Sequence, residues 1–206
     1  MIGIGEHVKS TLPPEPEKAT LEGKNKFLAF WFFLGGETVL FGSLFAVFLA
    51  LRSQTLSGPG AEDLFRLPVV FLATIILLTS SMTSVLAIMA MHRNDLRMMQ
   101  IWFLVTVVLG LAFLGLEVYE FAEYLNEGLG YTTSAFASAF YTLVGFHGAH
   151  VLFGVLWIST LLLKSKQKGI NVVTAPKYFV ASLYWHFVDV VWVFIFTVVY
   201  LMGKVG

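Results

Sequence analysis

Apolar positions along this chain fall into five long blocks, and short polar segments separate them. The blocks span residues 27–51, 67–91, 99–121, 135–163 and 178–202. A helix needs about 20 apolar residues to cross a hydrocarbon core of about 30 Å. Each block is long enough, so the pattern predicts an all-α integral membrane bundle of five transmembrane helices. We expect residues 27–206 to form a single transmembrane domain and residues 1–26 to form a polar tail.

The polar segments predict how the helices are oriented in the membrane. Residues 1–26 lack the apolar core and the cleavage site of a signal peptide, and Pro13 to Pro16 favour an extended lead-in. Ten of the thirteen Lys and Arg residues lie in this tail and in the second and fourth connections. Positive charge in short segments favours the cytoplasmic side. We therefore expect a cytoplasmic N-terminus and a C-terminus outside.

Composition supports the membrane assignment and removes several classes of chemistry. The chain is 57% hydrophobic and 13% charged, whereas charged residues make up about 25% of soluble domains. It has no cysteine, which excludes disulfides, thiolate zinc sites and Fe–S clusters. The net charge is zero without a basic block, so nothing indicates a nucleic-acid partner. No phosphate loop, nucleophile elbow or dinucleotide fingerprint occurs.

Glu37 is the most unusual residue of the first block. It lies ten residues into the block, which places it about 15 Å deep, near the midplane. Burial disfavours the charged form of a carboxyl, so we expect Glu37 to be protonated at neutral pH. Three roles remain open: a proton relay, a lipid or ligand contact, or a hydrogen bond that fixes helix packing.

Four further polar groups lie deep in the last two blocks. His147 and His150 are three apart, as are His186 and Asp189, and residues three apart share a helix face. Placing a charge at the centre of a membrane helix costs about 2.5 to 3.5 kcal/mol, so these groups are expected to face protein. They offer a conceivable metal site, but His-x-x-His alone is a weak signal. We therefore favour intramembrane structural hydrogen bonding for all four.

Acidic residues gather near the outer end of the third block. Glu117, Glu120 and Glu123 share a helix face there. We expect them to form an acidic face at the level of solvent or lipid headgroups.

Four strings resemble the subunit III family of haem-copper oxidases. They are YWHFVDVVWVFIF (184–196), GFHGAHVLFG (145–154), LGLAFLGLEVYEFAEY (109–124) and GGETVLFGSLFAVF (35–48). They occur in family order and cover four of the five blocks. The chain is similar to the short, five-helix bacterial form, and the lead-in ATLEGKNKFL (19–28) resembles the type found in Bacillus-like cytochrome c oxidases.

This resemblance implies a supporting role in the bacterial cell membrane. Members of the family pack on subunit I of a proton-pumping enzyme that reduces dioxygen to water, beside subunit II and a small subunit IV. Haem and copper lie in those partners, so this chain itself is expected to carry no cofactor apart from bound phospholipid. The resemblance makes Glu37 the family's carbodiimide-reactive carboxyl and the histidines structural. Residues of the lipid cleft that the longer, seven-helix form builds with its first two helices do not carry over.

Three alternatives remain at this stage. The electron donor is cytochrome c, which the lead-in favours, or a quinol. A stand-alone proton-coupled transporter would use Glu37, His186 and Asp189, although transporters usually show internal repeats and broken helices. An intramembrane metalloenzyme would use the four His and Asp groups as ligands.

Overall fold

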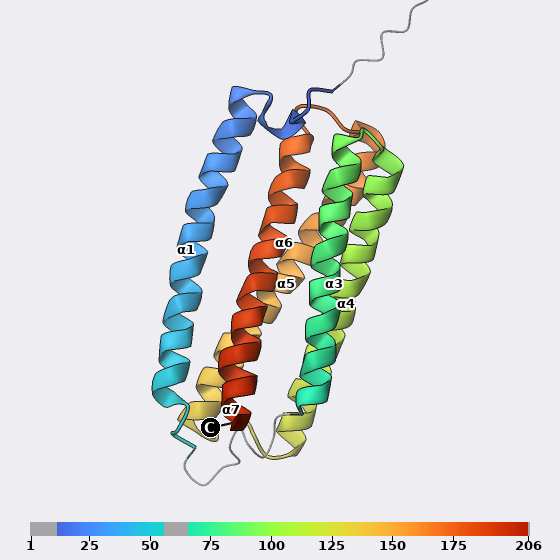
Figure 1. The fold of residues 1–206 in the computed structure, drawn as a ribbon. Coiled ribbons are helices and arrows are strands. Elements are labelled where there is room, and N and C mark those ends of the chain that lie inside the picture. The colour runs from blue at the N-terminus through green and yellow to red at the C-terminus, as the bar shows by residue number, and fades with distance from the viewer. Residues whose placement is uncertain (1–11, 56–65, 206) are drawn as a thin grey trace, which may run out of the picture.

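The computed structural model describes residues 12–55 and 66–205, and it confirms the five-helix architecture (Figure 1). The first 11 residues of the expected tail lie outside this described part. The elements are a short 3₁₀ turn η1 (Pro16–Lys18), α1 (Leu21–Leu51), α3 (Leu67–His92), α4 (Leu96–Asn126), α5 (Ala135–Lys168), α6 (Ala175–Ile195), the π-helical turn η2 (Phe196–Leu201) and α7 (Met202–Val205). Five helical segments are long and apolar enough to cross a membrane, the fifth being the continuous run Ala175–Lys204.

Several helices extend beyond the apolar blocks because capping residues, not hydrophobicity, set their ends. Thr20 accepts a hydrogen bond from the Gly23 amide at 3.0 Å, so α1 begins six residues before position 27. Asp95 and Ser134 cap α4 and α5 in the same way. Residues 21–26, which we placed in the tail, are therefore helical.

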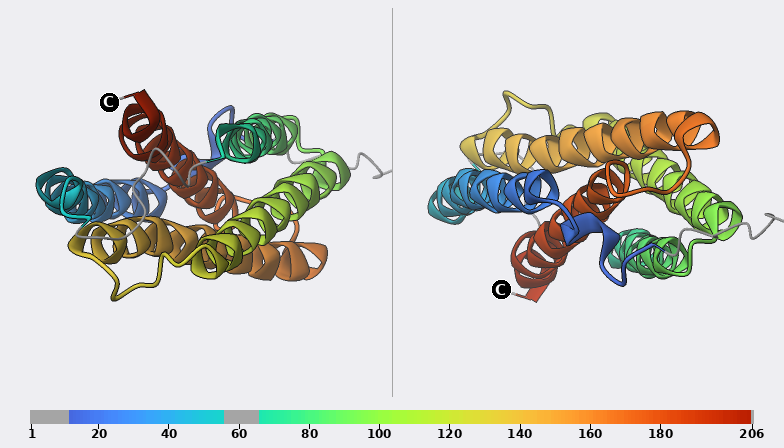
Figure 2. Two further views of the ribbon diagram at one scale, coloured as in Figure 1. Left: turned by 90° about the horizontal axis from the view of Figure 1, so that it is seen from below. Right: turned by 90° about the horizontal axis from the view of Figure 1, so that it is seen from above.

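The bundle consists of a tight α3–α4 hairpin on one side and α1 on the other, with α5 and α6 between them (Figures 1 and 2). α4 packs on α5, α3 packs on α6, and α1 packs on α5 and α6. The first helix is consequently the most exposed, with only 17% of its apolar window buried. Such a surface faces lipid or other subunits.

Two tryptophans of α6 organise the centre of the bundle. Trp185 and Trp192 are each only 1% exposed. The Trp185 indole N–H donates to Ser80 Oγ at 2.9 Å, and the Trp192 indole N–H donates to Thr74 Oγ1 at 2.9 Å. Both acceptors lie on α3, so the pair fixes the register of α6 against α3.

Two glycines make room for Trp185. A Cβ at Gly110 of α4 would lie 2.6 Å from Trp185 Cη2, and one at Gly154 of α5 would lie 2.9 Å from its Cε3. The indole therefore rests directly on the backbones of α4 and α5 while it bonds to α3. Close approach at small residues is how membrane helices gain packing energy without a hydrophobic driving force.

The segment before α1 is folded onto the bundle rather than extended. Glu17 in η1 is 4% exposed, and its carboxylate lies 3.1 Å from His92 Nε2 at the end of α3. η1 also contacts α6. This contact closes the end of the bundle where α1 and α6 begin.

We expect Gly110→Ala to destabilise the protein by about 1 to 3 kcal/mol, because the added methyl overlaps the Trp185 ring. Gly115→Ala on the same helix is the matched control, since nothing lies within 4 Å of its Cβ position. Thermal unfolding in mild detergent, followed by circular dichroism, measures both. Equal melting temperatures for the two variants would contradict the packing described for Trp185.

Candidate functional site

Glu37 and His150 form a contact between α1 and α5 at the middle of both helices. His150 Nε2 lies 3.0 Å from Glu37 Oε2, and their side chains are 18% and 17% exposed. Phe41 places its ring edge-on to the imidazole, at 4.9 Å between ring centroids. Tyr184 of α6 donates to the His150 carbonyl at 3.1 Å. The expected midplane carboxyl is therefore held by a specific partner.

The second nitrogen of His150 shows which hydrogen bonds its imidazole can make. His150 Nδ1 lies 2.6 Å from the Phe146 carbonyl oxygen, which can only accept a hydrogen bond. Nδ1 must therefore carry a proton. Nε2 then either accepts from a protonated Glu37 or donates to its carboxylate. In both states one proton lies between the two side chains, so the pair is suited to hold a proton inside the membrane.

His186 has a partner on α3. His186 Nδ1 lies 2.6 Å from Ser81 Oγ. Asp189, one turn farther along α6, is 7% exposed, and its Oδ1 has no hydrogen-bond partner among the described residues. Ser81 thus joins His186 of α6 to α3.

His147 differs from our expectation of a structural hydrogen bond within the described part of the chain. Its side chain is fully buried, and neither ring nitrogen finds a hydrogen-bond partner within the described part of the chain. The ring instead stacks on Trp192, with centroids 5.1 Å apart, and meets Phe113 edge-on at 5.8 Å. His147 and His150 lie on adjacent sectors of α5, which is enough to give them different neighbours.

The histidines and Asp189 do not come together. Across residues 12–55 and 66–205, no group of three or more His, Asp or Glu side chains is placed to hold a metal ion. His150 faces α1, His147 packs on Trp192, and His186 bonds to α3. The arrangement therefore gives no geometric support to the metalloenzyme alternative.

The acidic residues near the end of α4 are not a solvated face. Glu117 and Glu120 are 6% and 3% exposed. Glu120 accepts a hydrogen bond from Tyr124 at 2.7 Å. The Glu117 carboxyl lies against Gly148 of α5, where a Cβ would be 2.5 Å from Oε1, and it has no hydrogen-bond partner among the described residues. Our expectation was wrong for these two residues because α4 turns this face toward α5.

Glu123 is the exception, and it binds a cation that the sequence did not single out. Arg66, which precedes α3, pairs with Glu123 at 2.5 Å and with Glu127 at 3.0 Å. The hydrogen bond that Arg66 donates to Glu127 and the charge of Glu123 raise the pKa of the Arg66 guanidinium above its ordinary value. These ion pairs tie the start of α3 to the end of α4.

Sequence reasoning missed the hydroxyl groups of α3. Thr74, Ser80 and Ser81 are the acceptors or partners for three side chains of α6. The sequence does carry hydroxyl residues at positions 74, 81 and 84, which are seven and three residues apart and so share one helix face. Ser84 of this stripe bonds to Ser182 of α6 at 2.7 Å.

Comparison with known proteins assigns the chain to a family. The family model for cytochrome c oxidase subunit III matches residues 17–204. The chain belongs to this family. Cytochrome c oxidase subunit 3 of Bacillus sp. (strain PS3) is 67% identical over 197 residues, 95% of each chain, and that of Bacillus subtilis (strain 168) is 61% identical over 197 residues, again 95% of each chain.

Relatives that are named as quinol oxidase subunits have lower sequence identity to this chain. Quinol oxidase subunit 3 of Bacillus subtilis (strain 168) is 45% identical over 201 residues, 98% of each chain. The identities favour the cytochrome c oxidase branch of the family over the quinol oxidase branch.

We expect Ser81→Ala to destabilise the protein by about 1 to 3 kcal/mol, because the partly buried His186 then loses its hydrogen-bond partner on α3. Thr79→Ala on the same helix serves as the control, since the Thr79 hydroxyl is exposed and bonds only to its own helix at Ile75. Denaturant titration in detergent compares the two variants. Equal loss of stability would show that Ser81 does not join the helices.

Proposed function

We propose that this chain is the subunit III of a proton-pumping haem-copper oxidase that receives electrons from cytochrome c and reduces dioxygen to water. The observation that carries this proposal is the 67% identity over 95% of both chains with a cytochrome c oxidase subunit 3. Five membrane-spanning helices agree with a multi-pass protein of the bacterial cell membrane. The chain packs on subunit I and adjoins subunit II and a small subunit IV, and the haem and copper centres belong to partner subunits.

The chemistry of the bundle fits a supporting role. Glu37 bonds to His150, His186 bonds to Ser81, and both Trp185 and Trp192 bond to α3. These buried polar groups are used to join helices, which is what a stabilising subunit requires. The large exposed apolar surface of α1 offers area for subunit and lipid contacts.

The Glu37–His150 pair is the candidate for a proton-linked function. Its geometry holds one proton between a carboxyl and an imidazole at the midplane of the bundle. Such a pair assists proton uptake by the complex if its shared proton exchanges with water on the cytoplasmic side. Glu37 also faces the partly exposed side of α1, where a phospholipid contact is compatible with its position.

The distribution of cations supports a cytoplasmic N-terminus. One end of the bundle holds the start of α1, the turn between α3 and α4, the end of α5 and the start of α6 (Figure 1). The cations Lys18, Lys24, Lys26, Arg93, Arg97, Lys164, Lys166, Lys168 and Lys177 belong to these segments. Arg52, Arg66 and Lys204 belong to the opposite end. The positive-inside rule then assigns the first end to the cytoplasm.

A quinol oxidase is the second candidate, because a quinol oxidase subunit 3 is 45% identical across 98% of the chain. The transporter alternative is weaker. Substrate sites in transporters are built at broken helices near the midplane, whereas α1, α3, α4 and α5 run as continuous α-helices. The π-helical turn η2 lies at the end of α6, away from the midplane.

Material purified through a tag on this chain in mild detergent is expected to show a haem A signal in its reduced-minus-oxidised visible spectrum and to contain two larger subunits. Oxygen consumption by this material should be faster with reduced cytochrome c than with a quinol. A colourless, self-contained protein would refute the oxidase assignment. Faster turnover with the quinol would move the chain to the second candidate.

Glu37→Ala is expected to leave the initial rate of oxygen consumption largely intact. It should shorten the time over which the oxidase stays active, because the Glu37–His150 hydrogen bond between α1 and α5 is lost. Glu22→Ala removes an exposed carboxyl from the same helix and serves as the control. Prolonged turnover assays in an oxygen electrode measure both quantities. Immediate, complete loss of activity in Glu37→Ala would contradict a supporting role.

A further inference from the structure

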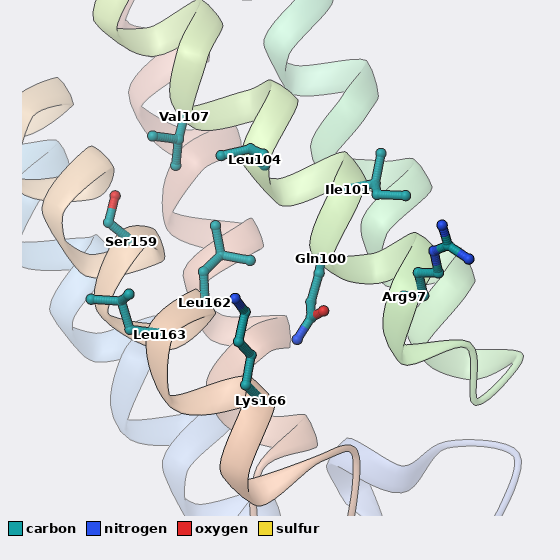
Figure 3. Close-up of a pocket in the computed structure, with 9 residues that line it drawn as sticks. All are labelled: Arg97, Gln100, Ile101, Leu104, Val107, Ser159, Leu162, Leu163 and Lys166. Carbon is teal, nitrogen blue, oxygen red and sulfur yellow. The ribbon is translucent and has the colours of Figure 1, made fainter.

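A groove of about 570 Å³ runs between α4 and α5, at the end of the bundle where α4 begins and α5 ends (Figure 3). Its wall is apolar over most of its length, with Ile101, Leu104 and Val107 on α4 and Leu162 and Leu163 on α5. The groove opens to the outside of the bundle (Figure 3). Its size is within the range of small-molecule sites.

Two cations and an amide lie at the mouth of this groove. Arg97 lies on the α4 rim with its guanidinium turned away from α5, and Lys166 extends along the groove between Gln100 and Leu162 (Figure 3). Gln100 is fixed in place, because its Nε2 donates to Ser165 Oγ at 2.7 Å and so links α4 to α5. Arg97 and Lys166 are both exposed, and neither forms an ion pair with a carboxylate of the described residues. Their positive charge is available to a ligand.

The length of the groove matches one leaflet of a bilayer. From Arg97 to Val107 the helix rises about 15 Å, and half of a hydrocarbon core is also about 15 Å. The cations lie at one end of this distance and the apolar residues occupy the rest. A ligand that fits must therefore be negatively charged at one end and apolar for one leaflet depth.

We propose that the groove between α4 and α5 binds an anionic phospholipid, with its headgroup at the end of the groove that Arg97 and Lys166 border and an acyl chain along Leu104, Val107 and Leu162. Basic pockets between transmembrane helices are the usual sites for such headgroups. The site gives a location to the lipid binding proposed above, but it requires only that the chain spans a bilayer. The haem spectrum tests the oxidase assignment separately.

Other occupants fit the groove less well. A free phosphate uses the two cations and leaves the apolar wall exposed. A partner helix covers the apolar wall but leaves the two cations unpaired unless it carries an acidic residue at their level. A phospholipid with one acyl chain seated and its headgroup at the rim satisfies both the charges and the wall.

The experiment uses the intact complex that contains this chain, reconstituted in phosphatidylcholine vesicles. A trace of phosphatidylglycerol or phosphatidylcholine that carries a photoreactive group on one acyl chain is added, and labelled peptides are identified by mass spectrometry. We expect phosphatidylglycerol to label peptides around Leu104 and Leu162 at least about fivefold more than phosphatidylcholine. Each Lys or Arg near a bilayer surface strengthens the binding of an anionic lipid about fivefold.

A double variant and a charge-matched control separate this site from general surface charge. Arg97→Gln with Lys166→Gln should reduce the phosphatidylglycerol labelling at least about fivefold. Arg93→Gln with Lys168→Gln removes the same charge from exposed positions at the same end of the bundle that do not line the groove, and it should retain the labelling. Leu104→Trp fills the groove with both cations intact and should also lose the labelling, and this exposed position tolerates the larger side chain.

Three results would overturn the proposal. Equal labelling by the two lipids means that the groove holds only bulk lipid. Equal effects of the two double variants mean that the cations act through overall surface charge. No labelling of the groove peptides in the unsubstituted complex means that another subunit covers this face.

Discussion

The indole of Trp185 is the contact on which the arrangement of the bundle depends. One side chain of α6 bonds to Ser80 of α3 and rests on the backbones of α4 and α5 at Gly110 and Gly154. In a lipid environment apolar surface gives helices little reason to associate, so such close packing and interhelical hydrogen bonds must supply the specificity. Trp192 repeats the arrangement farther along α6 with Thr74, Phe113 and His147. The first helix is not part of this centre and is attached mainly through its contacts with α5 and α6.

The buried ionisable groups divide into those that join helices and those that remain without a hydrogen bond in the described structure. Glu37 with His150 and His186 with Ser81 belong to the first kind. Glu117 and His147 belong to the second. An unpaired buried polar group costs about 1 to 3 kcal/mol, so both are places where the chain gives up stability. Their neighbours explain how they are tolerated: Glu117 lies against Gly148, and His147 stacks on Trp192.

The division between prediction and structure is clearest at the acidic and histidine residues. Helical periodicity correctly placed Glu117 and Glu120 on one face of α4, but it does not say which way that face points, and α5 covers it. His147 and His150 illustrate the same limit, since residues three apart differ by about 60° around the helix axis. That difference sends one ring to Trp192 and the other to Glu37. The hydroxyl partners on α3 were also missed, because they become meaningful only beside α6.

By itself the sequence determined the class of the protein, the number of membrane-spanning helices and the family, because these follow from apolar length and from linear strings such as residues 184–196. It also identified Glu37 and His150 as buried polar groups worth explaining. Only the tertiary structure decided that these two meet, that Glu117 is buried and that Arg97 and Lys166 border one groove. The physical reason is that hydropathy is a property of each segment, whereas partners and grooves depend on the rotation and crossing of helices that are far apart in the chain.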